Sequence, residues 1–334
     1  MFSRLAPGTA LVILVALTAA GLGSLESQAF GRPVVEPLVL AILVGMIVRS
    51  ARAEPAGIEA GVRFFAKQVL EVAVLLLGAT MDVPELFASG PFLALGIVAL
   101  VCVALATGYG IGRIAGLSPK LSLLVASGNA ICGNSAIAAV APVIGAERED
   151  VAASIALTAV FGVVVVLALP LVIPIFGLSQ QQYGVLAGLT VYSVPQVLAA
   201  AFAVSTVSGQ VATVVKLARV LMLGPVVTFF ALRSRRASTA SLSSLVPWFV
   251  VGFVVLAVAR SAGFVPDAAA DGAKLVAGWL TIAAMAALGL SVDVRVVRAV
   301  GPRIVAAVGL SLIALVCLAL ALITALPAGT SSPR

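Results

Sequence analysis

The residues best suited to chemistry lie in Ser127 to Ala136, SGNAICGNSA, inside a long apolar stretch. Its two glycines and two asparagines disfavour a continuous helix, since Gly costs about 1 kcal/mol relative to Ala in a helix interior. A break here creates a helix N-terminus at Gly133 to Ser135, whose free N–H groups and positive dipole end suit an anion. Close packing through small residues is the alternative, but it leaves Asn129 and Asn134 unexplained. The segment, with Cys132 in the break, predicts an anion-binding site.

A second candidate is the segment Thr190 to Ala200, TVYSVPQVLAA. Pro195 removes a backbone hydrogen bond, and Gln196 places an amide in an apolar stretch. Tyr192 and Ser193 add hydroxyl groups beside it. A simple proline kink is the alternative explanation, but the polar groups favour a second part of the same substrate site.

Two cations, Lys216 and Arg219, lie in the apolar segment VVKLARVL. They are three residues apart and therefore share a helix face. Each costs about 3 kcal/mol or more if it faces lipid, so both must have partners. Glu71 is the obvious carboxylate, and an ion pair with it is the structural alternative. One net positive charge remains even then, which favours an anionic substrate.

These groups need a scaffold, and the composition indicates a membrane protein. Of the 334 residues, 62% are hydrophobic and 10% charged, whereas a soluble chain carries about 25% charged residues. The apolar runs are long and do not alternate as barrel strands do, so the spans are helices. The chain has no His, and its cysteines at 102, 132 and 317 are far apart. We therefore expect no catalytic residues, metal or cofactor.

A transmembrane helix needs about 20 apolar residues. On that rule we predict a single all-α domain over residues 1–334, with about eleven transmembrane helices, some of them discontinuous. The predicted spans are 6–23, 34–49, 62–80, 91–115, 119–145, 150–177, 182–204, 208–232, 243–262, 270–291 and 301–327. The first of these also fits a signal peptide, because Arg4 precedes it and small residues follow.

The charges between the spans predict an orientation. Basic loops fall on one side, at Arg49, Arg52, Arg63 and Lys67; Arg113 and Lys120; Arg233, Arg235 and Arg236; and Arg295, Arg298 and Arg303. The opposite loops are mainly acidic or neutral, as at Asp82 with Glu85 and Asp267 with Asp271. Positive loops stay inside. We expect a bacterial-type inner membrane, a cytoplasmic N-terminus and a C-terminus outside.

An internal repeat supports a transporter. Residues 77–91, LGATMDVPELFASGP, align without a gap with residues 288–302, LGLSVDVRVVRAVGP. The aligned copies share Gly, Asp, Gly and Pro, and an odd number of predicted spans between them inverts one relative to the other. Ordinary Gly-Pro turns are the alternative. Inverted repeats are typical of secondary carriers with a site near the bilayer midplane.

The chain resembles a known family at these motifs. NAICGNSAIAAVAPVIGA is similar to a signature with an S-x-C-G-x-x-A-x-x-A-x-x-P-V core, with Ala130 in place of Ser, and TVYSVPQVLAA is similar to T-V-H-E-V-A-Q-V-V-A-A. VVKLARVLMLGPVV and AAMAALGLSVDV also match, over about residues 35–320. The family is the sulfate exporter group of YeiH-type inner-membrane proteins, grouped with cation/proton antiporter and bile-acid-symporter-like folds. The resemblance implies about eleven spans, broken helices and export of sulfate or an organic sulfonate.

One departure concerns coupling, because Tyr192-Ser193 stands where the family has His-Glu and Pro195 where it has Ala. We predict a secondary active anion transporter that works by alternating access, with Glu71 as the coupling or proton-carrying residue. The predicted substrate residues are Asn129, Cys132, Gly133, Asn134, Ser135, Tyr192, Ser193, Gln196, Lys216 and Arg219. A cation/proton antiporter that uses Glu71 is the alternative. The expected partners are a small anionic solute, a coupling proton or cation, the lipid bilayer and a second copy in a homodimer; neither nucleic acid nor enzymatic activity is expected.

Overall fold

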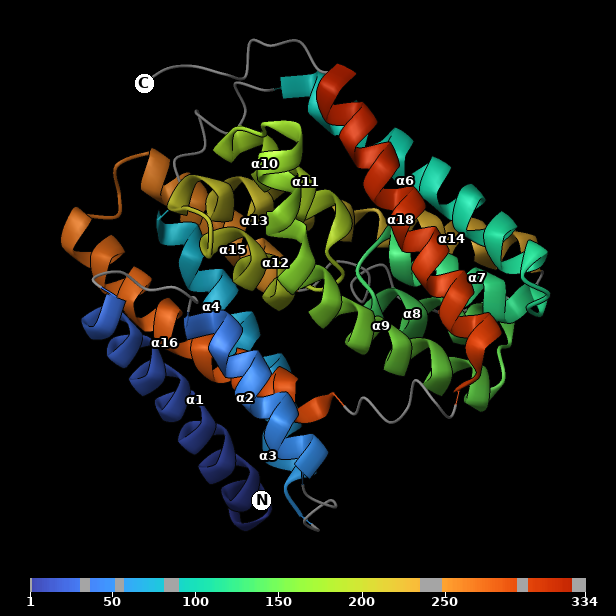
Figure 1. Ribbon diagram of the computed structural model, residues 1–334. Helices are drawn as coiled ribbons and strands as arrows, with labels where there is room; N and C mark the ends of the chain where they lie inside the picture. Colours follow the sequence, from blue (N-terminus) through green and yellow to red (C-terminus); the bar gives the residue numbers. More distant parts are fainter. Residues whose placement is uncertain are drawn as a thin grey trace. The chain divides into compact units, whose positions relative to one another are not determined.

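A computed structural model shows helices throughout the part of the chain that it describes, residues 2–30, 37–51, 57–80, 90–234, 248–292 and 300–325 (Figure 1). The chain divides into two compact units. Unit 1 comprises Met1–Glu85 and Trp248–Asp293, and unit 2 comprises Leu86–Pro247 and Val294–Arg334. Each unit is therefore built from two stretches of chain.

Unit 1 is a bundle of long helices. Its elements are α1 (Phe2–Phe30), α2 (Pro37–Ala51), α3 (Glu59–Phe64), a π-helical turn (Phe65–Val69), α4 (Leu70–Leu77), a 3-10 turn (Gly78–Thr80), α15 (Trp248–Ser261) and α16 (Asp267–Ser291). Glycines allow its helices to pack closely. Gly45 of α2 lies against Gly289 of α16, and Gly78 lies against the backbone of Phe253. Gly78 and Gly289 are equivalent positions of the predicted repeat, and both leave no room for a Cβ.

Unit 2 holds the segments singled out by sequence. Its helices are α6 (Gly90–Ile114), α7 (Pro119–Ala130), α8 (Asn134–Ile144), α9 (Arg148–Ala168), a 3-10 turn (Leu169–Leu171), α10 (Val172–Phe176), α11 (Gln180–Thr190), α12 (Val194–Phe202), α13 (Thr206–Leu221), α14 (Leu223–Ser234) and α18 (Pro302–Ala325). An apolar cluster of Leu121, Val125, Leu157 and Val308 joins α7, α9 and α18.

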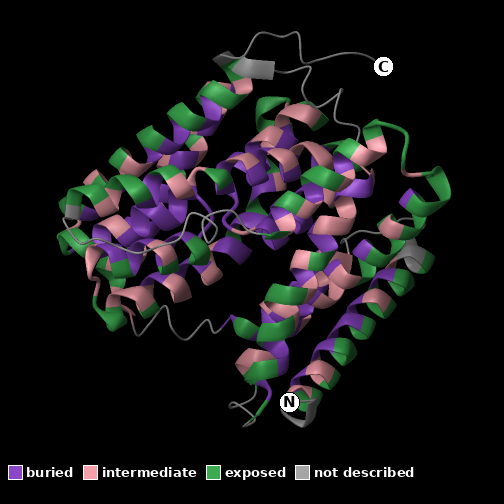
Figure 2. Ribbon diagram, turned by 180° about the vertical axis from the view of Figure 1, so that it is seen from behind, coloured by how far each residue is buried: buried purple, intermediate pink, exposed green. Residues whose placement is uncertain are grey.

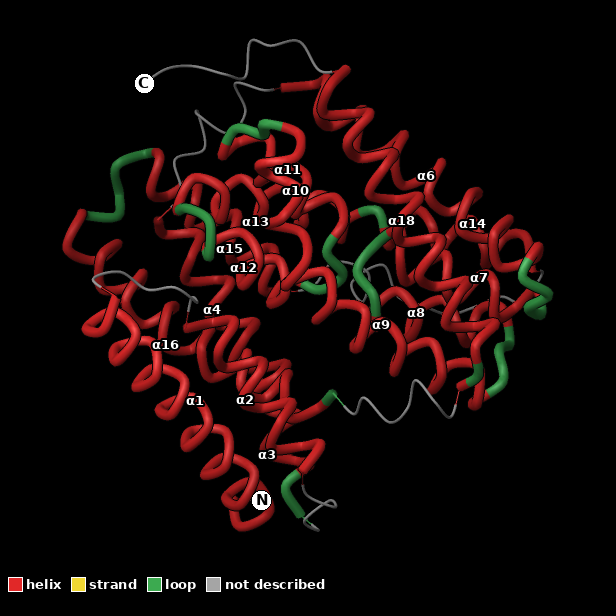
Figure 3. Tube along the Cα trace, in the orientation of Figure 1, coloured by secondary structure: helices red, strands yellow, loops and turns green. Residues whose placement is uncertain are grey.

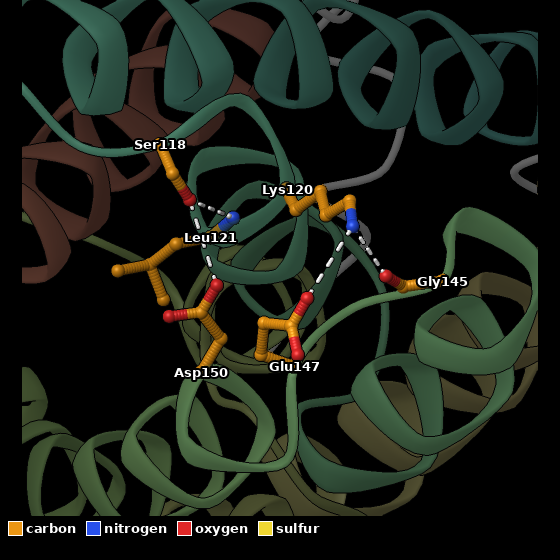
Figure 4. A network of polar contacts seen from close by, with 6 residues as sticks. All are labelled: Ser118, Lys120, Leu121, Gly145, Glu147 and Asp150. Carbon is orange, nitrogen blue, oxygen red and sulfur yellow. Dashed lines mark hydrogen bonds and ion pairs between the residues drawn. The ribbon is translucent and has the colours of Figure 1, made fainter.

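Helices α7 and α8 form a hairpin, which we call hairpin 1 (Pro119–Ile144). Lys120, in the first turn of α7, donates a hydrogen bond of 2.6 Å to the carbonyl of Gly145, just after α8 (Figure 4). Its Nζ also lies 3.7 Å from Glu147 Oε1, and Ser118 Oγ lies 3.5 Å from Asp150 Oδ2. The two ends of the hairpin are therefore at the same place, and the chain reverses between them.

Helices α11 and α12 form a second hairpin, hairpin 2 (Gln180–Phe202). Tyr183, near its start, donates from its hydroxyl to the carbonyl of Ala200, near its end, at 2.9 Å. Ser208 in the first turn of α13 donates to the carbonyl of Gln180 at 2.8 Å. The chain thus returns to the starting end of α11 before α13 begins. Figure 3 shows both interruptions as loop segments between helices.

These hairpins correct two of the predicted spans, 119–145 and 182–204. Each arm has 9 to 12 residues, so the longest reaches about 18 Å at 1.5 Å per residue, against about 30 Å of hydrocarbon. Hydropathy alone does not show the error, because two short arms together are as long and as apolar as one span. The sequence correctly predicts the breaks but not the reversal of the chain.

The remaining predicted spans coincide with helices, although a count of eleven is not confirmed. Within the described residues, six helices are long and apolar enough to cross a membrane: Leu5–Glu26, Phe92–Ile114, Arg148–Phe176, Thr206–Arg233, Asp267–Ser291 and Pro302–Thr324. The helices α2 and α15 are shorter. Asp82, Glu85, Asp293 and most of both repeat copies lie outside the described residues, as do Arg52, Arg235, Arg236, Arg295 and Arg298.

A crossing helix follows each hairpin, and the two run in opposite directions. The segment α9–α10 starts beside the base of hairpin 1, where Asp150 contacts Ser118, and ends just before the base of hairpin 2. The segment α13–α14 starts beside the base of hairpin 2, and α14 packs against α8 of hairpin 1. The hairpins therefore enter unit 2 from opposite ends, and their tips meet inside it.

Candidate functional site

The tips of the two hairpins are three-residue interruptions, 131–133 and 191–193. Gly133 has φ +67° and ψ −120°, which L side chains rarely adopt, and it precedes the first residue of α8. A Cβ at Gly133 would lie 3.3 Å from the Cβ of Tyr192, so the two tips touch. Each tip ends one helix and begins another, which places two C-termini and two N-termini close together.

Lys216 of α13 binds both tips. Its side chain is 0% exposed, and Nζ donates to the carbonyl of Ile131 at 2.7 Å and to that of Val191 at 2.8 Å. These carbonyls follow the last residues of α7 and α11. The ammonium group therefore caps one helix of each hairpin.

Arg219, one turn further along α13, satisfies the carbonyls just before the tips. Nε donates to Ala130 at 3.1 Å and Nη2 to Asn129 at 2.8 Å, both in α7. Nη1 donates to Gly188 at 3.1 Å and also to Leu189, both in α11. The guanidinium is 0% exposed. It replaces the intrahelical partners that carbonyls at a helix end lack.

The cations therefore lie at the negative ends of two helix dipoles. Each such end carries about half an elementary charge, and Arg219, which stays protonated in proteins, offsets both. The alternative expected from sequence was an ion pair with Glu71. Glu71 instead accepts a 2.8 Å hydrogen bond from Trp248 Nε1 within unit 1, and the hydrogen bonds of both cations go to main-chain carbonyls.

The N-terminal ends of α8 and α12 meet a different helix, α9. Thr158 Oγ1 donates to Asn134 Oδ1 at 2.7 Å, at the first residue of α8. One turn further along α9, Gly162 lies directly against the carboxamide of Gln196, in the first turn of α12. Residues four apart share a helix face. The two positive helix ends are therefore neighbours along α9.

Burial, which Figure 2 shows by colour along the ribbon, differs between these two helix ends according to the exposure of their residues. Asn134 and Ser135 are exposed, whereas Gln196 is 2% exposed and Ser193 is half-buried. Every residue of α12 from Val194 to Ala201 is buried. The start of α8 is therefore accessible, whereas the start of α12 is enclosed.

The other predicted residues lie around the tips. Asn129, 2% exposed, donates from Nδ2 to Ser311 Oγ of α18 at 2.5 Å, which ties hairpin 1 to the neighbouring helix. Cys132 is buried in the turn, and Tyr192 is buried with no hydrogen-bond partner for its hydroxyl among the described residues. The structure thus brings together all the predicted substrate residues, whereas Glu71 belongs to unit 1.

Two residues that contribute to this site were not predicted, Thr158 and Gly162. They lie in the apolar run IALTAVFGVVVV, where a hydroxyl residue and a glycine four apart are the only signal. That spacing indicates a close helix contact but not what the contact is. The position of their partners depends on both hairpins folding back, which sequence alone did not reveal.

The described helices, their apolar surfaces and the buried polar tips define an all-α integral membrane protein with two re-entrant hairpins. A family model described as "Conserved hypothetical protein 698" matches residues 7–308. Because that match covers most of the chain, the protein belongs to this family.

Curated relatives are similar over nearly their whole length. A UPF0324 membrane protein of Bradyrhizobium diazoefficiens is 51% identical over 305 residues, 90% of this chain and 87% of the relative. A UPF0324 membrane protein of Brucella melitensis is 50% identical over 298 residues, 88% of this chain and 84% of the relative. One from Bacillus cereus is 31% identical over 299 residues, 88% and 84% of the two chains. No solved structure matches significantly.

Proposed function

We propose that this protein is a secondary active transporter of a small anion, bound where the N-terminal ends of α8 and α12 meet along α9. The observation that carries the proposal is the distribution of charge at the tips. Lys216 and Arg219 offset the negative helix ends, whereas no described acidic side chain of unit 2 contacts the positive ends of α8 and α12. Helix N-termini with free N–H groups are general anion sites.

The acidic residues of unit 2 support an anion over a cation. Across Leu86–Pro247 and Val294–Arg334 the sequence contains only Glu147, Glu149 and Asp150. All three lie at the base of hairpin 1, at or next to the contacts drawn in Figure 4. A cation site at the tips would need carboxylate ligands, which this unit does not place there. The family resemblance favours sulfate or an organic sulfonate as the anion.

Two hairpins that enter from opposite ends suit alternating access. Each tip separates the site from one side, and moving one hairpin at a time opens a path from that side only. The membrane potential would act directly on the cargo, since one elementary charge crossing 100 mV gains or loses about 2.3 kcal/mol. Export with a coupled proton or cation is the direction that the resemblance favours.

The basic loops place the base of hairpin 1 in the cytoplasm. If neither hairpin crosses the bilayer, two of the predicted crossings are lost. The number of crossings then stays odd, so the two termini remain on opposite sides of the membrane, as predicted from the sequence. Lys120 and Arg113 stay on the same side as Arg233, as the rule that positive loops stay inside requires. The proposed location is a bacterial-type inner membrane, with the N-terminus inside and the C-terminus outside.

Transport in proteoliposomes tests this function. We expect saturable uptake of radiolabelled sulfate or methanesulfonate that exceeds uptake by protein-free liposomes and responds to an imposed potential. The alternative function, cation/proton antiport through Glu71, predicts instead sodium-dependent proton movement that Glu71→Gln abolishes. Antiport without uptake of either anion would reject the anion transporter.

A further inference from the structure

The orientation of the Gln196 carboxamide is fixed by the chain itself. Oε1 accepts a 3.2 Å hydrogen bond from the main-chain N–H of Ser193. A main-chain N–H can only donate, so the atom that faces it must be the carbonyl oxygen. The Nε2 amino group therefore faces away from this N–H and lies against Gly162, with two donors and no hydrogen-bond acceptor among the described residues.

Gly162 leaves the space that this carboxamide occupies. A Cβ built on Gly162 would meet Nε2 of Gln196 first and would lie 2.5 Å from both Cδ and Oε1, so the three nearest atoms all belong to that side chain. Such distances are too short for any side chain, so the carboxamide of Gln196 occupies the volume that an alanine methyl group would fill. Gly162 is thus required for the position of one group only.

We propose that Gln196 donates from Nε2 to the bound anion, and that Gly162 is the positioning residue that holds this donor at the end of α12. The inference rests on the anion-transport function proposed above. Because the acceptor side of the amide is occupied by Ser193, this side chain offers the ligand a donor and no acceptor. It therefore favours an oxoanion without a proton, such as sulfate, over one that carries a hydroxyl hydrogen, such as hydrogen phosphate.

The decisive variant is Gln196→Glu, studied at pH 8 with purified full-length protein. A carboxylate keeps the oxygen that accepts from Ser193 N–H, so the helix cap is preserved, but the donor is lost and a negative charge faces the anion. We expect sulfate affinity to fall at least about tenfold, as loss of a hydrogen bond to a charged group implies. Binding is measured by the ligand-dependent rise in melting temperature, with sodium sulfate, sodium phosphate and sodium methanesulfonate as probes.

The ratio of sulfate affinity to phosphate affinity distinguishes a direct ligand role of Gln196 from a purely structural role. Sulfate and hydrogen phosphate both carry two charges at pH 8, and only the second can donate to a glutamate. The variant should therefore lose more affinity for sulfate than for phosphate, which lowers the ratio of the two affinities. Equal losses for both ions, or unchanged sulfate binding, would overturn the role of Gln196.

Gly162→Ala tests the positioning role, with Gly110→Ala as its matched control. Gly110 also lies in a unit 2 helix, and a Cβ there meets nothing within 4 Å. We expect Gly162→Ala to weaken sulfate binding and Gly110→Ala to leave it unchanged. In a Gln196→Ala background the clash is gone, so adding Gly162→Ala should change the melting temperature little; a full additive loss there would reject the assigned contact.

Binding by the wild-type protein distinguishes failure of the proposed function from failure of the assignment to Gln196 and Gly162. If neither sulfate nor methanesulfonate raises its melting temperature, the proposed function fails and takes the inference with it. If the wild type binds and the variants bind equally well, anion binding stands and only the assignment to Gln196 and Gly162 is wrong.

Discussion

The helices α9 and α13 play corresponding parts in unit 2 but treat the hairpin tips differently. Each follows a hairpin and runs past both tips. Helix α13 offers two long cations that bind the C-terminal ends of α7 and α11. Helix α9 offers a hydroxyl and a glycine, which contact the N-terminal ends of α8 and α12. The comparison shows that fixed charge binds the C-terminal helix ends at the tips, whereas the N-terminal ends contact only neutral groups of α9.

The difference also separates the residues that stabilise the tips from those proposed to contact a ligand. Lys216 and Arg219 satisfy carbonyls that would otherwise be buried without partners, so they are needed for the fold of the tips. The predicted substrate role of both cations remains untested. Under the proposed function, their charge would act on the anion through the shared potential of the tips, whereas the α9 side would offer direct contacts.

The largest expected effect is an all-or-none difference in thiol labelling between the two hairpin bases. It tests whether the chain reverses within each hairpin. In a variant without the three native cysteines, Lys120→Cys and Glu149→Cys should react with an impermeant thiol reagent from the same side of the membrane. Gln180→Cys and Thr206→Cys should react from the opposite side only. The measurement is labelling of right-side-out and inverted vesicles. Labelling of positions 120 and 149 from opposite sides would show that residues 119–145 cross the bilayer.

Arg219→Met should produce the largest loss of stability. It leaves the carbonyls of Asn129, Ala130, Gly188 and Leu189 unpaired, at about 1 kcal/mol or more each. We expect little monodisperse protein on size-exclusion chromatography of a fluorescent fusion. Arg260→Met is the control, since Arg260 makes a partly exposed ion pair with Asp267 worth about 0–1 kcal/mol. Normal folding of Arg219→Met would mean that the carbonyls find other partners.

The loss of stability caused by Lys216→Met should lie between those of Arg219→Met and Arg260→Met. The substitution frees two carbonyls, those of Ile131 and Val191, so we expect about half the destabilisation of Arg219→Met, roughly 2 kcal/mol. The melting temperature in detergent measures the effect. A Lys216 that acts as a ligand alone predicts the opposite result: an unchanged melting temperature with sulfate binding lost.

Sequence reasoning predicted the chemistry of the tips better than their geometry. The Gly and Asn residues around Gly133, and Pro195 with Gln196, correctly indicated two helix breaks. A break does not reveal the angle between its two arms, however, and residues 119–145 are long enough for a single span. The helix-capping residues mark only the outer ends of hairpin 1, as they would for a single span: Ser118 caps α7, and Gly145 ends α8 in a left-handed conformation.

The partners of the cations could not be predicted at all. Lys216 and Arg219 bind main-chain carbonyls, which every residue carries, so no residue type marks them in the sequence. The search for a balancing side chain led to Glu71, because it lies at the middle of a predicted span, 62–80. Burial of the two cations was predicted and is confirmed, since both are 0% exposed.

Thr158→Val should give the smallest stability change and is the sharpest test of the α9 side. Valine keeps the shape of the side chain but loses the hydrogen bond to Asn134 Oδ1, a loss of about 1 kcal/mol. Thr281→Val is the matched control, because Thr281 is also buried and its hydroxyl bonds only the carbonyl of Ala277, one turn earlier. Both variants should melt within a few degrees of the wild type. Thr158→Val alone should weaken sulfate binding, because Asn134 then loses the contact that fixes it at the start of α8. If both variants bind sulfate equally well, α9 only packs against the tips, and the contrast with α13 does not extend to the ligand.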